Sequence, residues 1–139
     1  MSGRRSLAGL VCAAALVVGV AEAQLPGEVS AASTTVMRQL EAFRRGDFDA
    51  AYGFASTSIK EIFDRPTFEI MVRRGYPEIA QSTSAVVTGG DVGADGHVHV
   101  RLTIHGANGR SVDAVYDMVQ EGSDWRIDGV AAKPTTGTI

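Results

Sequence analysis

The chain has 139 residues, a formal net charge of −3 and a single cysteine. This length suits one domain. The acidic excess, with no basic cluster beyond isolated Arg-Arg pairs, argues against nucleic acid and anionic membranes as partners. A single cysteine also excludes a structural zinc site of the cysteine type.

Residues 1–23 have the pattern of a secretory signal peptide. A short basic start is followed by an uncharged apolar run, and Ala21 and Ala23 are the small residues that signal peptidase recognises before Gln24. The run is shorter than the roughly 20 residues that span a bilayer. We therefore expect cleavage before Gln24, a periplasmic or secreted location and no stable membrane anchor afterwards. Cleavage also removes Cys12, so the remaining chain has no disulfide.

The rest of the chain divides by composition and by the period of its apolar residues. Residues 24–32 are small and polar with a Pro-Gly break, which predicts a flexible linker. A single domain over 33–133 follows, with a tail over 134–139. Its first part, residues 33–80, has apolar residues at helical spacing and predicts three or four linked helices.

The boundaries of these helices have their own signals. Gly46 is placed to end the first helix, and Asp47 or Asp49 can cap the second. Pro66 is expected to break the third, and Thr67 to cap the fourth. The first helix would bury a stripe made of Val36, Met37, Leu40 and Phe43.

The second half of the chain changes to an alternating, β-branched pattern. Four short segments show it, with turn residues between them: 84–89, 97–105, 111–120 and 125–132. The glycine-rich stretch between the first two segments reads as a turn. Helices followed by strands predict an α+β domain in which helices pack on one face of an antiparallel sheet.

The hairpin registers follow from keeping apolar residues opposite one another. A three-residue loop over 107–109 does so, with Gly109 in the left-handed conformation of a bulge. It gives the pairs Ile104–Val112, Leu102–Ala114, Val100–Tyr116 and His99–Asp117. A two-residue loop, Gly122-Ser123, then pairs Met118 with Ile127 and places Asp117 opposite Asp128.

All three histidines, His97, His99 and His105, lie on the polar face of one predicted strand. Only His99 gains acidic neighbours in this register, because Asp117 and Asp128 continue its row across the sheet. The row could hold zinc or manganese, respond to pH, belong to a dimerising face, or be the solvated face of the sheet.

The apolar face, closed by the helices, is the better candidate for a ligand site. Tyr52, Tyr76, Tyr116 and Trp125 could line a pocket there, each with one polar tip. The alternative is that they are core aromatics with satisfied hydrogen bonds.

Motifs of catalysis and cofactor binding are absent from the sequence, so no cofactor and no catalytic residue is predicted. An enzyme that uses acid-base catalysis in this pocket would need a carboxylate among its apolar residues. The register sends Asp113 to the outer face, and Asp49 and Asp64 fit better as helix-cap or loop residues.

Several stretches resemble a bacterial family known as domain of unknown function 4864. They are "QLEAFRRGDFDAAYGFAS", "FEIMVRRGYP" and "YDMV…WRIDGV". The resemblance covers roughly residues 36–130. It implies an NTF2-like cone, in which helices fill the concave face of a curved antiparallel sheet, and implies no established chemistry.

These observations lead to three hypotheses about function. The first is an exported, non-enzymatic module that binds a small apolar ligand or a protein partner in the cone. By analogy with the wider fold, the second is a cofactor-free lyase or isomerase of ketosteroid-isomerase type. The third is a structural module that forms a homodimer through the sheet. A carboxylate buried beside Tyr116 would favour the second, and a filled cone would exclude a ligand.

Overall fold

The computed structural model describes residues 25–136. The predicted signal peptide and its cleavage site before Gln24 lie outside these residues. In the part that is described, no helix is both long enough and apolar enough to cross a membrane.

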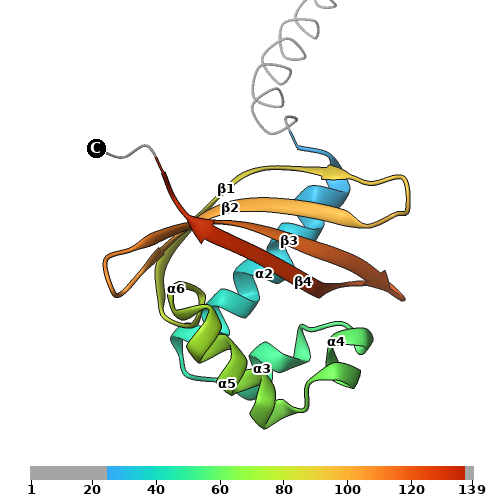
Figure 1. Cartoon of the computed structure of the whole chain (residues 1–139). Helices are drawn as coiled ribbons and strands as arrows, with labels where there is room; N and C mark the ends of the chain where they lie inside the picture. Colours follow the sequence, from blue (N-terminus) through green and yellow to red (C-terminus); the bar gives the residue numbers. More distant parts are fainter. Residues whose placement is uncertain (1–24, 137–139) are drawn as a thin grey trace, which may run out of the picture.

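The helices come first along the chain and lie on one side of the sheet (Figure 1). Among the described helices α2 is the longest, and it packs across β1, β2 and β4. The shorter helices form a second group below the sheet in Figure 1. Their bounds are α2 Gly27–Arg44, α3 Phe48–Gly53, α4 Thr57–Ile62, α5 Arg65–Gly75 and α6 Pro77–Ala80.

The second half of the domain is a single curved antiparallel sheet with strand order β1-β2-β3-β4. Each strand therefore pairs with its neighbour in sequence. The strands are β1 Ser82–Val92, β2 Val98–Gly106, β3 Ser111–Glu121 and β4 Asp124–Pro134. The α+β prediction, with helices on one face of an antiparallel sheet, is confirmed.

The start of α2 differs from the prediction. The helix begins at Gly27, so most of the segment expected to be a linker is its first turn and a half. Val29 and Ala32 have no exposed surface and belong to the core. The Pro-Gly pair misled the prediction because Pro26 is the N-cap residue of the helix, where proline is tolerated.

The caps explain where the other helices begin and end. Gly46 has φ 72° and follows α2, as predicted. Asp47, and not Asp49, caps α3 by accepting a hydrogen bond from the Ala50 amide. The predicted cap of α5 is wrong, because Asp64 caps it by accepting a hydrogen bond from the Thr67 amide. The preceding helix, α4, ends before Pro66 as predicted, and Pro66 itself lies in the first turn of α5.

The register predicted for the β2–β3 hairpin is confirmed. The four predicted pairs, from Ile104–Val112 to His99–Asp117, are all present. Gly109 has φ 83° and ends the loop. The β3–β4 register is confirmed as far as Met118–Ile127.

Beyond this pair the prediction is wrong. Asp117 pairs with Gly129, so Asp128 is an extra residue that forms a β-bulge in β4. β1 is also longer than expected and includes part of the glycine-rich stretch read as a turn.

One apolar core joins the two layers. The inner face of the sheet contributes alternating buried residues, and α2 packs its apolar stripe against them. Val36, Leu40 and Phe43 of the predicted stripe are buried, and Met37 is partly buried against the core.

Candidate functional site

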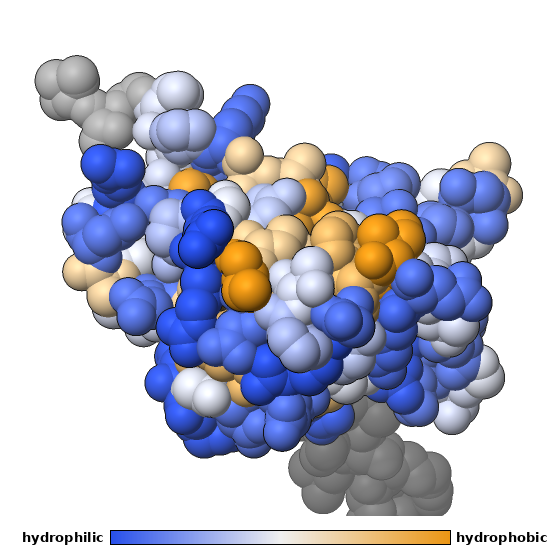
Figure 2. All heavy atoms as spheres, turned by 60° about the horizontal axis from the view of Figure 1, so that its bottom comes forward, coloured by the Kyte–Doolittle hydropathy of each residue, from blue (hydrophilic) through white to orange (hydrophobic). Residues whose placement is uncertain are grey.

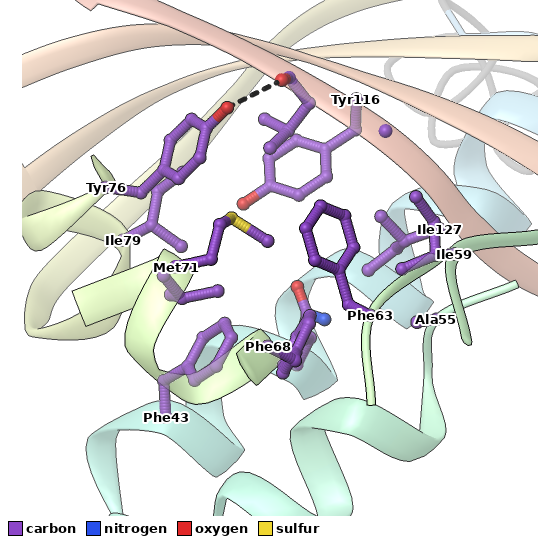
Figure 3. A pocket seen from close by; sticks show the side chains of 14 residues that line it. Phe43, Ala55, Ile59, Phe63, Phe68, Met71, Tyr76, Ile79, Tyr116 and Ile127 are labelled. Atoms are coloured by element: carbon purple, nitrogen blue, oxygen red, sulfur yellow. Dashed lines mark hydrogen bonds between the residues drawn. The ribbon is translucent and has the colours of Figure 1, made fainter. Parts of the chain in front are cut away.

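A cavity of about 200 Å³ lies between the shorter helices and the inner face of the sheet (Figure 3). Side chains from α5 and from the α4 region form one wall, and β3 and β4 form the other. Figure 2 views the molecule from the side of the helices, where apolar residues reach the surface between hydrophilic ones. The lining residues are Gln39, Phe43, Ala55, Ile59, Phe63, Phe68, Met71, Val72, Tyr76, Ile79, Tyr116, Ile127, Gly129 and Val130.

Tyr116 is the distinctive polar group of this cavity. It lies on the inner face of β3 opposite Val130, its side chain is 1% exposed, and its ring is directed from the sheet toward Met71 of α5 (Figure 3). Its hydroxyl has no hydrogen-bond partner among the described residues. Burial raises the pKa of Tyr116 well above its usual range, so the phenol is a neutral donor and acceptor.

Two further polar groups line the cavity, and each has a partner in the protein. The hydroxyl of Tyr76 donates a long hydrogen bond, 3.4 Å, to the carbonyl oxygen of Val130 (Figure 3). Gln39, buried in α2, donates from Nε2 to the carbonyl oxygen of Ala51 at 3.1 Å. Its amide is therefore fixed in place, and its Oε1 can act as an acceptor.

The predicted aromatic residues divide into two pairs. Tyr76 and Tyr116 line the cavity, but Tyr52 and Trp125 do not. Tyr52 packs edge-on against the lining residue Phe68, with ring centroids 5.2 Å apart. Its hydroxyl donates to the carbonyl oxygen of Phe63 at 2.7 Å, so it supports the wall from behind. Trp125 is half-buried at the start of β4, opposite Gln120.

The apolar residues of the wall carry no sequence signal that would mark them as the lining of a cavity. Phe68, Met71 and Val72 have the spacing of a helical core stripe, and that spacing cannot distinguish a filled core from the lining of a cavity. A cavity depends on how two layers are held apart, which is a property of tertiary packing.

None of the carboxylates considered for acid-base chemistry reaches the cavity. Asp49 is exposed and pairs with Arg65. Asp64 caps α5, and the amide and hydroxyl of Thr67 lower the pKa of its carboxyl group. Asp113 lies on the outer face of the sheet, where Thr103 and Thr135 donate hydrogen bonds to it.

The row of polar residues on the outer face has a different arrangement from the predicted one. His97 Nδ1 lies 2.7 Å from Asp117 Oδ1, whereas His99 Nε2 is 3.9 Å from the same atom. His99 turns its Nδ1 toward Asp91 of β1, at 3.0 Å. His99, which lies directly opposite Asp117, therefore contacts Asp91 of β1. His97, which is diagonal to Asp117, makes the close contact with it.

These contacts shift the pKa values of His97 and Asp91. The hydrogen bond with Asp117 raises the pKa of His97, and partial desolvation opposes the rise. His99, followed by Arg101, lowers the pKa of Asp91 through hydrogen bonds. Asp128 completes a group with His97 and Asp117, while His99 is outside that group.

The comparisons with known proteins place the chain in a family but give it no activity. Residues 29–138 match the family described as "Domain of unknown function (DUF4864)". No curated protein and no solved structure matches the chain. The matched segment begins inside α2 and covers all the other described elements. The chain therefore belongs to the domain of unknown function family DUF4864.

Proposed function

We propose that this domain is an exported binding module that holds a small, neutral and mostly apolar molecule in the cavity between helices and sheet. The observation that supports this is the Tyr116 hydroxyl, which is buried in an apolar cavity without a partner. A buried hydroxyl without a hydrogen bond costs free energy, and a ligand that bonds to it removes that cost.

The size of the cavity restricts the ligand. An apolar cavity of about 150 Å³ holds benzene, whereas sites for drug-sized ligands occupy roughly 300–1,000 Å³. The cavity here, at about 200 Å³, fits a molecule with one ring and a short substituent. Within residues 25–136 no charged side chain lines it, so an ionised ligand would be desolvated without compensation.

The polar groups restrict the ligand further. Tyr116 can donate to a carbonyl or hydroxyl oxygen, and Gln39 Oε1 can accept from a hydroxyl on the same molecule. A few polar groups in a mostly apolar pocket are the usual arrangement for fixing the orientation of a ligand. The ligand we propose is therefore an aromatic ketone, aldehyde or phenol of single-ring size.

The same lining favours binding over proton abstraction. An isomerase of the ketosteroid type needs a carboxylate base next to its oxyanion donors. Tyr116 could act as such a donor, but Asp49, Asp64 and Asp113 all have partners away from the cavity. We therefore place the binding function ahead of the lyase or isomerase function.

A matched pair of probes tests the proposal. Acetophenone has a carbonyl oxygen, and α-methylstyrene has nearly the same shape without it. In calorimetric titrations we expect acetophenone to bind the protein about 2- to 10-fold more tightly, which is the range for one neutral hydrogen bond. In Tyr116→Phe this preference should disappear.

Tyr76→Phe is the control, because the Tyr76 hydroxyl already donates to Val130. It should leave the preference for acetophenone in place. If neither probe binds, or if the preference survives in Tyr116→Phe, the proposal is wrong. Native mass spectrometry of the purified protein would detect a retained ligand or protein partner and would show whether the chain is a dimer.

Export is the second part of the proposal, and it rests on the sequence of residues 1–23. Intact-mass measurement of the protein from the exported fraction should give a chain that begins at Gln24. Ala23→Asp should prevent cleavage, because the peptidase needs a small residue there. A full-length chain in the cytoplasm would contradict this part alone.

A further inference from the structure

The outer face of the sheet, opposite to the cavity, brings together a histidine and two aspartates. His97, Asp117 and Asp128 each offer one ligand atom, and these atoms all lie within 4.8 Å of one another. All three residues are partly buried. The group is distinct from the ligand cavity, because none of its members lines that cavity.

The β-bulge in β4 places the second carboxylate in this group. Met118 pairs with Ile127 and Asp117 pairs with Gly129, so Asp128 is the additional residue between the two pairs. The extra residue changes the direction of its side chain relative to a regular ladder, and its carboxylate lies within 4.8 Å of the ligand atoms of His97 and Asp117. Bulges often redirect one side chain at functional sites.

A buried serine orients the Asp128 carboxylate. Ser56 Oγ accepts a hydrogen bond from the Ile59 amide at 3.2 Å and lies 2.7 Å from Asp128 Oδ1. Its proton is therefore donated to Asp128, which leaves Oδ2 of that carboxylate available. Hydrogen bonds of this kind hold the carboxylate ligands of metal sites in position.

The negative charge of the group is not neutralised by a permanent cation. Within residues 25–136, neither Asp117 nor Asp128 forms an ion pair with lysine or arginine. Asp117 contacts the rings of His97 and His99, which carry charge only when protonated. Two neighbouring carboxylates without a basic partner are stabilised by a divalent cation.

We propose that His97, Asp117 and Asp128 bind one divalent transition-metal ion, with Zn²⁺ as the best fit. One imidazole nitrogen and two carboxylate oxygens suit Zn²⁺, and their combined charge of about −2 matches the ion. Three protein ligands leave one tetrahedral position for water or for an exogenous ligand.

Zinc titration against a chromogenic chelator, using untagged protein, tests this site. We expect the protein to bind one Zn²⁺, and His97→Ala to weaken binding at least tenfold. Asp128→Asn is a second variant that keeps the hydrogen bond with Ser56 and should weaken binding by a similar factor. Circular dichroism of each variant without metal establishes that it folds.

Two histidine variants are matched controls. His105 lies on the same face but bonds to Ser111, so His105→Ala should bind Zn²⁺ like the wild type. His99→Ala should change the affinity by less than about threefold, because its near partner is Asp91. The proposal is overturned if the wild type does not bind Zn²⁺, if His97→Ala and Asp128→Asn bind it normally, or if either control loses it.

Discussion

At the scale of single residues, the most informative side chain is Tyr116. Its neighbours on the inner face of β2 and β3 are apolar and fully buried, and it adds one hydroxyl to that surface. In most proteins a buried hydroxyl finds a partner inside the molecule. An unpartnered hydroxyl costs stability, and this cost is the reason for the proposal that a ligand binds to Tyr116.

Tyr116→Phe should therefore make the ligand-free protein more stable. Removing the unpartnered hydroxyl should raise the free energy of unfolding by about 1 kcal/mol, which urea denaturation can measure. Tyr76→Phe removes a hydroxyl that donates to Val130 and should not stabilise the protein. A clear loss of stability in Tyr116→Phe would mean that the hydroxyl has a partner, such as a bound water.

At the scale of elements, the contact between α2 and β1 has little free space. A Cβ atom at Gly90 would lie 2.5 Å from Val29 Cγ1 and 2.6 Å from the carbonyl oxygen of His99. The second neighbour is backbone of β2, which cannot move without disturbing the sheet. Glycine at this position allows α2 to approach the edge of the sheet.

Gly90→Ala should destabilise the domain by about 1–3 kcal/mol, the usual cost of adding a methyl group to a filled core. Gly53→Ala is the matched control, because its Cβ would meet no atom within 4 Å. It lies in α3 and should be neutral or slightly stabilising. Equal stability of the two variants in urea would show that both Val29 of α2 and the backbone of β2 can move enough to accept the methyl group.

The start of α5 gives a pH-dependent prediction. Hydrogen bonds from the hydroxyl and the amide of Thr67 lower the pKa of Asp64 below its ordinary value of 3.8. A lowered pKa in the folded state means that the stabilisation is complete above the unfolded pKa and is lost as pH falls through the folded one. The difference in thermal midpoint between wild type and Asp64→Ala should therefore be largest near neutral pH and shrink below about pH 4. A difference that is constant with pH would exclude the charged cap as its cause.

The elements also show what the sequence can predict. Alternation and turn length determined the β2–β3 register, because one-residue slips would exchange the apolar and polar faces. The bulge at Asp128 was not predictable, because it depends on Ala55 and Ser56 pairing with the outer edge of β4. The contact between His97 and Asp117 was not predicted for a related reason. Asp91, which contacts His99 instead, lies on a strand whose register had no local signal.

At the scale of the whole molecule, the helices and the sheet share one core, and the cavity separates them near α5. The α+β class and the burial of the main helical stripe could be derived from residue patterns, and the family was indicated by resemblance. The cavity could not, because its volume depends on how far α5 and α6 are held from β4. The same limit applies to the site. Tyr76 and Tyr116 were predicted as pocket residues because each has an aromatic ring with a polar tip, whereas Phe63 and Met71 offer no such signal.

The boundary of the folded domain is also a property of the whole molecule. The sequence suggests a start at Ser33, but Val29 and Ala32 are fully buried, and Val29 lies against Gly90 of β1. The free energy of unfolding should therefore be about 2–4 kcal/mol lower for a chain that begins at Ser33 than for one that begins at Leu25. The shorter chain loses buried apolar surface and has a shorter α2.

Two point variants in the longer chain separate these effects by urea denaturation. Val29→Ala should reproduce part of the loss, because it removes buried methyl groups without shortening the helix. Glu28→Ala is the control: it changes an exposed residue of the same turn and should alter stability by less than about 0.5 kcal/mol. If the two chain lengths unfold at the same urea concentration, residues 25–32 are a linker after all. If only the shorter chain is destabilised and Val29→Ala is not, the loss comes from the length of α2 and not from its contact with β1.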